Sequence, residues 1–168
     1  MNRLFTAARA AVYAAGFVLV WGWVAVRVRS WDARLPLTLP GWCRPAGILV
    51  ATAGAMLALS CLAVFVRVGH GTAAPFDPPR RFVAVGPYRF VRNPMYIGGF
   101  LVLVGAGLAV RSTAMSGFGL VFLAVMHAFV VLYEEPSLHR RFGDDYARYR
   151  RSVRRWLPGA GADPSSAG

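Results

Sequence analysis

Two segments of this chain carry residue types that could bind a small zwitterion. Asn93 followed by Pro94 is typical of a helix N-terminus, where free N–H groups and the positive end of the helix dipole favour an anion. Glu134 and Glu135 end an apolar stretch, although the dipole favours cations at a helix C-terminus. Such breaks of a local rule are typical of functional sites. Together, the two segments would bind a ligand that carries both charges.

The same residues also have explanations that need no ligand. The first segment could be a capped helix with tyrosine and arginine side chains as interfacial anchors. The two glutamates could form ion pairs with Arg140 or Arg141. Both alternatives stay open from the residues alone.

His127 is a third candidate, since it lies inside an apolar stretch seven residues before Glu134 and so nearly on the same helix face. An ionisable group at membrane depth is a functional candidate by default, and a hydrogen bond between helices explains it equally well. Cys43 and Cys61 have no metal-ligand spacing and are typical of small buried hydrophobes. We therefore predict no metal site.

Four long uncharged stretches must position these residues. Hydrophobic residues make up 57% of the 168 and charged residues 15%, against about 25% charged in soluble domains. The stretches are 10–26, 45–66, 93–110 and 112–133, and a helix that crosses a bilayer needs about 20 such residues. We predict an all-α polytopic membrane protein with about four transmembrane helices in a single domain, residues 1–158, and a disordered tail at 159–168.

The third and fourth stretches are separated by two or three residues, so we expect an antiparallel hairpin that brings Glu134 to the same face as Asn93. The third stretch is short and could cross the bilayer incompletely. Small residues suited to close helix packing are Gly98, Gly99, Gly105, Gly107, Gly117 and Gly119.

All 19 basic residues are arginines, against 7 acidic residues. The N-terminus, the 67–92 loop and the C-terminal tail hold 14 of them. The positive-inside rule places these segments, and thus both termini, in the cytoplasm, with the bacterial inner membrane as the expected location. The 27–44 loop then lies at the outer interface. Because the charge lies between apolar spans, anionic headgroups are the expected partner and nucleic acid is not.

The C-terminal segment predicts two short helices. The first ends at Gly143, and Asp144 or Asp145 caps the second, which Pro158 ends. One face of the second helix would present Tyr146, Tyr149, Val153 and Trp156. Arginines, including Arg151 and Arg155, fill its other faces. This pattern is typical of a basic amphipathic helix on an anionic membrane surface.

In this order, the segments resemble short bacterial-type members of the isoprenylcysteine carboxyl methyltransferase family, which is related to phospholipid N-methyltransferases. The first stretch that carries the resemblance is Gly86-Pro87-Tyr88 and Arg92-Asn93-Pro94-Met95-Tyr96-Ile97-Gly98. The second is Glu134-Glu135-Pro136-Ser137-Leu138, Phe142-Gly143-Asp144-Asp145-Tyr146, Tyr149, Val153 and Leu157-Pro158. Together they cover about 80–158, which would form the cofactor half of the domain.

The resemblance implies a membrane methyltransferase that uses S-adenosylmethionine and acts on a lipophilic acceptor. The implied cofactor residues are Arg80, Arg81, Phe82, Val83, Tyr88, Asn93, Pro94, Met95, Tyr96 and Glu134. Glu135 is the nearest candidate base if the acceptor must lose a proton, and Arg140 or Arg141 could bind an acceptor carboxylate. His127 and Val130 would line the acceptor site.

Two positions depart from the family pattern. Asn93 stands where the family usually has histidine, and Val130 stands where prenylcysteine enzymes have an arginine for the substrate carboxylate. The acceptor atom (oxygen, nitrogen or sulfur), the pathway and the oligomeric state stay open. Two alternatives remain: a non-catalytic membrane protein that kept the fold, and a sterol-reductase-like enzyme that uses a reduced nicotinamide, although such chains are longer and have more spans.

Overall fold

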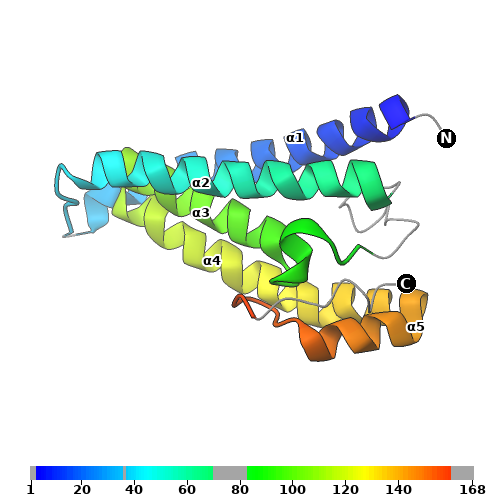
Figure 1. Ribbon diagram of the computed structural model, residues 1–168. Coiled ribbons are helices and arrows are strands. Elements are labelled where there is room, and N and C mark those ends of the chain that lie inside the picture. Colours follow the sequence, from blue (N-terminus) through cyan, green and yellow to red (C-terminus); the bar gives the residue numbers. More distant parts are fainter. Residues whose placement is uncertain (1–2, 36, 70–82, 160–168) are drawn as a thin grey trace.

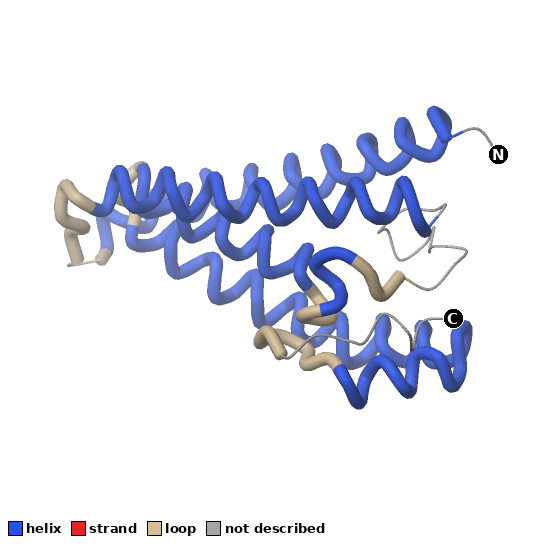
Figure 2. Tube along the Cα trace, viewed as in Figure 1, coloured by secondary structure: helices blue, strands red, loops and turns tan. Residues whose placement is uncertain are grey.

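The structure is a computed structural model that describes residues 3–35, 37–69 and 83–159. The described residues form helices and turns and contain no strand (Figure 2). In chain order the elements are α1 (Arg3–Val28), η1 (Arg29–Arg34), α2 (Cys43–Val64), η2 (Phe65–Gly69), η3 (Gly86–Arg89), α3 (Pro94–Ala109), α4 (Thr113–Phe129), η4 (Val130–Glu134) and α5 (Glu135–Ser152). The predicted all-α fold is confirmed.

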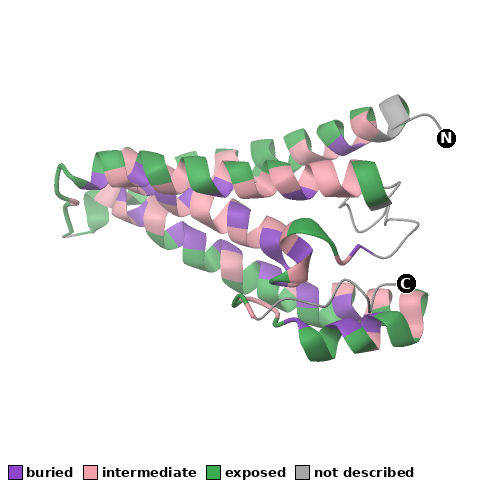
Figure 3. Ribbon diagram, in the orientation of Figure 1, coloured by how far each residue is buried: buried purple, intermediate pink, exposed green. Residues whose placement is uncertain are grey.

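Three helical stretches, which begin at Ala7, Cys43 and Thr113, are long and apolar enough to cross a bilayer. The side chains of Leu19, Leu49 and Leu132 are more than 70% exposed, and exposed residues cover the outer faces of α1 and α2 (Figure 3). An outer surface of large apolar side chains is unfavourable in water but suits lipid. The chain is thus an integral membrane protein.

Helix α3 is shorter than its neighbours, as expected. Its 16 residues extend roughly 24 Å at 1.5 Å per residue, against a hydrocarbon core of about 30 Å. It lies between α2 and α4 (Figure 1), so neighbouring helices supply much of its surroundings. Asn93 and Pro94 place its N-terminus at the end of the bundle where α4 leads into α5.

Glycines allow α2 and α3 to approach almost to backbone contact. A Cβ on Gly105 would lie 2.4 Å from the backbone nitrogen of Ala51, and one on Gly54 would lie 2.7 Å from the carbonyl of Gly98. The expectation of close packing is confirmed at Gly98, Gly105, Gly107 and Gly119, and it is wrong at Gly117, which has nothing within 4 Å. Gly98 and Gly105 face α2 rather than α4, so they fix α3 against α2 and not within the hairpin.

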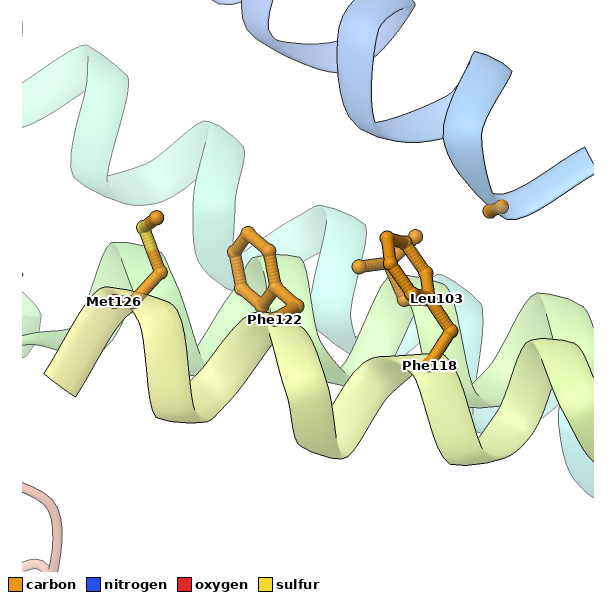
Figure 4. Packing of buried hydrophobic residues seen from close by; sticks show 5 residues of the cluster. Leu103, Phe118, Phe122 and Met126 are labelled. Atoms are coloured by element: carbon orange, nitrogen blue, oxygen red, sulfur yellow. The ribbon is translucent and has the colours of Figure 1, made fainter. Parts of the chain in front are cut away.

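A core of large side chains joins α1, α3 and α4. Phe118, Phe122 and Met126 recur every four residues on one face of α4 and pack with Leu103 of α3 (Figure 4), as an apolar helix face requires. The ring of Trp21 on α1 meets Phe122 edge-on, with centroids 4.8 Å apart. This contact fixes the middle of α1 against the hairpin.

The segment between α1 and α2 covers the turn between α3 and α4. Asp32 Oδ1 accepts a hydrogen bond from the backbone N–H of Ala114 at 2.8 Å, and Arg111 Nε donates to the carbonyl of Leu39 at 2.7 Å. Ser112 accepts from the N–H of Met115. The free N–H groups at the start of α4 are therefore partly satisfied by a residue 82 positions away.

We expect Asp32→Ala to lower the free energy of unfolding by about 1 kcal/mol, as for other lost helix caps. The physical reason is that Ala114 loses its hydrogen-bond acceptor while its surroundings stay packed. Thermal unfolding in detergent measures this effect. Asp32→Asn, which keeps an acceptor oxygen for the N–H of Ala114, is the matched control, and an equal loss of stability in this variant would contradict the assignment.

A single turn of π-helix, η4, links α4 to α5. Pro136 lies two residues after the end of this turn, and proline both lacks an N–H and clashes with the carbonyl four residues before it. A widened turn at this point accommodates the ring without breaking the helix. The spacing of side chains before and after η4 therefore departs from a regular helix.

Gly143 reverses the chain inside α5. Its φ of 51° and ψ of −123° are non-helical, and the second part of α5 returns beside the first (Figure 1). The predicted break at Gly143 is confirmed. The helix ends at Ser152, with Val153 extended, so the expected continuation to Pro158 is wrong.

The reversal also changes what the apolar face of this segment contacts. Tyr146, Tyr149 and Val153 are buried against the protein, and their neighbours are Ala84, Leu138 and Phe142. The segment is basic and amphipathic, as predicted, but the expectation that this face lies on the membrane is wrong. The fold at Gly143 turns it toward the first half of α5 instead.

Candidate functional site

Glu134 and Tyr96 come together from the two segments singled out in the sequence. Tyr96 Oη donates a hydrogen bond to Glu134 Oε2 at 2.9 Å, across 38 positions of the chain. The expectation that the hairpin brings Glu134 beside the start of α3 is confirmed. Among the described residues, Tyr96 is the only hydrogen-bond donor to Glu134. Its second carboxylate oxygen thus keeps its lone pairs for a ligand.

The start of α3 differs from the expected capped helix. Asn93 occupies the cap position and is buried, but its side chain accepts no hydrogen bond from the first turn. Its amide Nδ2 instead donates to the carbonyl of Arg155 at 3.2 Å. The predicted capping role of the Asn93 side chain is therefore wrong, because a distant carbonyl holds it. Pro94 begins the helix, as predicted, and is buried.

Tyr88 and Met95 form one wall beside this helix start. Tyr88 is buried with Cys61 and Val83, and Met95 packs against them. The ring of Phe65 meets Tyr88 edge-on, with centroids 5.4 Å apart. Burial raises the pKa of Tyr88 well above its ordinary value, so its phenol stays neutral at physiological pH. Tyr88 can then shape the site or donate a hydrogen bond, but it cannot supply a negative charge.

Glu135 points away from Glu134, as expected for adjacent helical residues about 100° apart. Its Oε1 lies 2.7 Å from Arg155 Nε and 3.2 Å from Arg92 Nη1, and its Oε2 accepts from Arg155 Nη2 at 3.0 Å. The hydrogen bond to Glu135 raises the pKa of Arg155 above its ordinary value. Glu135 is thus bound on both oxygens.

Arg140 and Arg141 are not the partners of the glutamates. Both are exposed, and the guanidinium of Arg141 lies over the ring of Phe142, 5.7 Å from its centroid. The alternative of an ion pair between these arginines and the glutamates is wrong, because the chain reversal at Gly143 brings Arg155 to Glu135 instead. Their predicted role with an acceptor carboxylate stays a prediction.

Residues 153–159 form a C-terminal strap along the segment that precedes α3. The N–H of Arg92 donates to the carbonyl of Arg154 at 2.9 Å, and the N–H of Gly159 donates to the carbonyl of Phe90 at 3.0 Å. Tyr149 Oη reaches the carbonyl of Tyr88 at 2.5 Å. Sequence reasoning missed the strap and the ion pair of Arg92 with Glu135. One residue could have indicated the strap. Arg155 is a tail arginine that the sequence analysis assigned to the exposed face of a helix, whereas it binds Glu135.

His127 on α4 and Val130 at the start of η4 differ in their surroundings. His127 is exposed, and its Nδ1 accepts a hydrogen bond from Trp156 Nε1 at 2.9 Å, whereas Val130 is 1% exposed. The expectation that His127 shares a face with Glu134 is wrong, because the π turn between them changes the register. The alternative of a structural hydrogen bond is the one observed, although its partner is the strap rather than another membrane helix.

Three predicted cofactor residues, Arg80, Arg81 and Phe82, lie outside the described residues, so their roles stay predictions. Val83 is described and buried. Within the described ranges, no group of three or more histidine, cysteine, aspartate or glutamate residues could hold a metal ion.

Several known proteins are similar to this chain. A methanethiol S-methyltransferase 1 from Bradyrhizobium diazoefficiens is 26% identical over 152 residues, which cover 84% of this chain and 50% of that protein. The nickel-cobalt-cadmium resistance protein NccN from Alcaligenes xylosoxydans xylosoxydans is 35% identical over 68 residues, which cover 39% of this chain and 32% of NccN. An uncharacterized protein from Haemophilus influenzae is 39% identical over 64 residues, which are 38% of this chain and that protein's full length. No solved structure matches.

Residues 42–145 match the phospholipid methyltransferase family. This range exceeds half of the 168 residues. It contains α2, α3, α4, the π turn and both glutamates. It also includes the Tyr96–Glu134 contact described above. The chain therefore belongs to the phospholipid methyltransferase family.

Proposed function

We propose that this membrane methyltransferase uses S-adenosylmethionine and transfers its methyl group to a lipophilic acceptor. The observation that carries the proposal is the contact between Tyr96 and Glu134 at the start of α3. It joins a carboxylate to a helix N-terminus, and these are complementary to the ammonium and carboxylate groups of the cofactor.

The described residues fit such a cofactor. Glu134 has an oxygen with no described partner, the first turn of α3 has no side-chain cap, and the buried Nε of Arg92 makes no hydrogen bond. Buried polar groups are normally paired, so an open acceptor beside an uncapped helix start, with an unbonded guanidinium nitrogen on the residue before Asn93, indicates a polar ligand. When bound, the cofactor supplies an activated methyl group on a sulfonium.

The chain's own residues would then act mainly by positioning and by excluding water. Tyr96 orients the carboxylate of Glu134, which would hold the ammonium group of the cofactor. The N–H groups of the first turn of α3 and the guanidinium of Arg92 would hold the carboxylate group of the cofactor. The wall around Tyr88 and Met95 contributes apolar surface. Since Glu135 is bound by two guanidiniums, we assign it no proton transfer.

Val130 limits the class of acceptor. In prenylcysteine enzymes, which this chain resembles, an arginine at this position meets the substrate carboxylate, whereas here the side chain is apolar and buried. We therefore propose an acceptor without a carboxylate. A small or lipid thiol is the first to test, because the similar Bradyrhizobium protein is named for methanethiol.

Calorimetric titration of the protein in nanodiscs tests cofactor binding. We expect one S-adenosylmethionine per chain, with an affinity that EDTA leaves unchanged, because the described residues bring no three candidate metal ligands together. S-adenosylhomocysteine, which keeps the ammonium and carboxylate, should bind at the same site. A folded protein that binds neither compound would contradict the proposal and favour a non-catalytic membrane protein.

We also propose that both termini face the cytoplasm in the bacterial inner membrane, with 14 of 19 arginines on that side. Reporter fusions after Arg29, Arg67, Arg111 and Gly168 test this topology. Fusions at Arg67 and Gly168 should report the cytoplasm, and the other two the periplasm. A C-terminal fusion active only in the periplasm would contradict the proposal and move the site to the outer face.

The proposed topology brings exposed arginines of α5 close to the cytoplasmic leaflet, where anionic headgroups are the proposed partner. The exposed members are Arg140, Arg141, Arg148, Arg150 and Arg151. Arg155 does not belong to this group, because its guanidinium is bound to Glu135.

A further inference from the structure

We infer that Glu135 and Arg155 form a latch that positions the cofactor site by holding the C-terminal strap against the segment before α3. The inference rests on the proposed function for its effect on S-adenosylmethionine, and it makes Glu135 a positioning residue rather than a base. No contact between the latch and the cofactor is needed.

Arg155 contacts Glu135 at the start of α5 through its side chain and Asn93 at the start of α3 through its backbone. Its guanidinium binds Glu135 through Nε and Nη2, at 2.7 and 3.0 Å, and such bidentate pairs fix orientation as well as distance. Its backbone carbonyl accepts from Asn93 Nδ2 at 3.2 Å. The carbonyl of Arg155 holds the side chain of Asn93 away from the first turn of α3. Any displacement of Arg155 would therefore also move the side chain of Asn93.

The strap depends on such contacts because it has left the helix. Val153 is extended, and the strap meets the preceding segment through only two described backbone hydrogen bonds, at Arg92 and at Gly159. Trp156, next to Arg155, donates to His127 on α4. The latch lies between these points, so it holds the middle of the strap where the Asn93 contact is made.

The charges around Glu135 predict an unusual pattern of substitution effects. Arg92 and Arg155 both lie within 4 Å of this carboxylate. Glu135→Gln leaves two guanidiniums that repel each other, whereas Arg155→Gln leaves Glu135 paired with Arg92. The double variant has neither the repulsion nor the latch. Glu135→Gln should therefore be the most disruptive of the three, and adding Arg155→Gln to it should restore part of the loss.

The position of the strap can be read independently of ligand binding. In protein labelled with 5-fluorotryptophan, the ¹⁹F resonance of Trp156 is assigned as the signal that Trp156→Phe removes. We expect Glu135→Gln and Arg155→Gln to shift this resonance and leave the signals of Trp21 and Trp31 in place. Arg151→Gln removes the same charge from an exposed position, so it is the matched control and should shift none of them.

The affinity for S-adenosylmethionine in nanodiscs completes the test. We expect Glu135→Gln to weaken binding roughly tenfold, the loss that corresponds to about one charge-assisted hydrogen bond, and Arg155→Gln to weaken it less. Arg155→Lys keeps the charge but not the bidentate geometry, so it should recover part of the affinity that Arg155→Gln loses. Arg151→Gln should leave it unchanged.

Each outcome distinguishes the latch from the proposed function. If the wild-type protein binds no S-adenosylmethionine, the proposed function fails, while the Trp156 resonance and the double variant still test the latch. If binding occurs but Glu135→Gln and Arg155→Gln change neither the resonance nor the affinity, the latch is wrong. If Glu135→Gln does not fold, the Trp156 resonance and the affinity are compared between Arg155→Gln and Arg155→Lys instead. Equal values in both variants would then show that the latch is wrong.

Discussion

Replacing Glu134 with glutamine is expected to weaken S-adenosylmethionine binding by roughly tenfold to a hundredfold. The substitution removes the negative charge that would hold the cofactor's ammonium, and a hydrogen bond to a charged group contributes roughly 1.5–3 kcal/mol. Glutamine keeps the shape of the side chain and can still accept the hydrogen bond from Tyr96. The fold should therefore be retained, and titration of variant and wild type in nanodiscs isolates the loss of charge.

Tyr96→Phe is the matched control for the geometry of this pair. It removes the 2.9 Å hydrogen bond but keeps the charge of Glu134 and the aromatic ring. We expect a loss of about fivefold, in keeping with roughly 1 kcal/mol for an ordinary hydrogen bond. If Tyr96→Phe weakened binding more than Glu134→Gln, the tyrosine hydroxyl would be the direct ligand contact and the role assigned to Glu134 would be wrong.

The meeting of the two motif segments was predictable from sequence. A loop as short as the one around Arg111 forces α3 and α4 into a hairpin, and a hairpin places the start of one helix beside the end of the other. The apolar length of each stretch then sets how far apart Asn93 and Glu134 can lie. Helix geometry alone therefore predicts that Glu134 lies near the start of α3, and the structure shows that the residue there which meets it is Tyr96.

The surroundings of this contact were not predictable in the same way. A π turn leaves no periodic signal, so the seven-residue spacing from His127 to Glu134 suggested a shared face that the structure lacks. Gly143 was recognised as a helix end, but a break does not specify its angle. That angle decides whether Arg155 lies at the membrane surface or beside Glu135. Anionic headgroups and the carboxylate of Glu135 could each bind its guanidinium.

Long-range caps were also missing from the sequence analysis. Asp32 lies in η1, within the 27–44 segment that was expected at the outer interface, yet its carboxylate accepts a hydrogen bond from the N-terminus of α4. Asn93 had the expected cap identity and a different partner. In both cases the residue type indicates that the side chain needs a hydrogen-bond partner. Only the tertiary structure determines which group is that partner.

A substitution in the glycine contact between α2 and α3 is expected to have the second large effect. It should lower the free energy of unfolding as well as weaken ligand binding. Gly105→Leu would place a Cβ 2.4 Å from the backbone nitrogen of Ala51 and 2.7 Å from the carbonyl of Gly47. Backbone atoms cannot rotate away as side chains can, so the two helices must separate. We expect a loss of about 3 kcal/mol in the free energy of unfolding, the upper end of the usual range for overpacked cores.

Gly117→Leu on α4 is the matched control, because a Cβ there would have nothing within 4 Å. A leucine side chain that faces lipid is also favourable. Thermal unfolding in detergent should separate the two variants clearly. Since α3 carries Asn93 and Tyr96 at its start, separation from α2 should also weaken S-adenosylmethionine binding in Gly105→Leu, even in the fraction that stays folded. Equal stability of the two variants would show that α2 and α3 do not cross at this glycine, and the site would then need a different support for the first turn of α3.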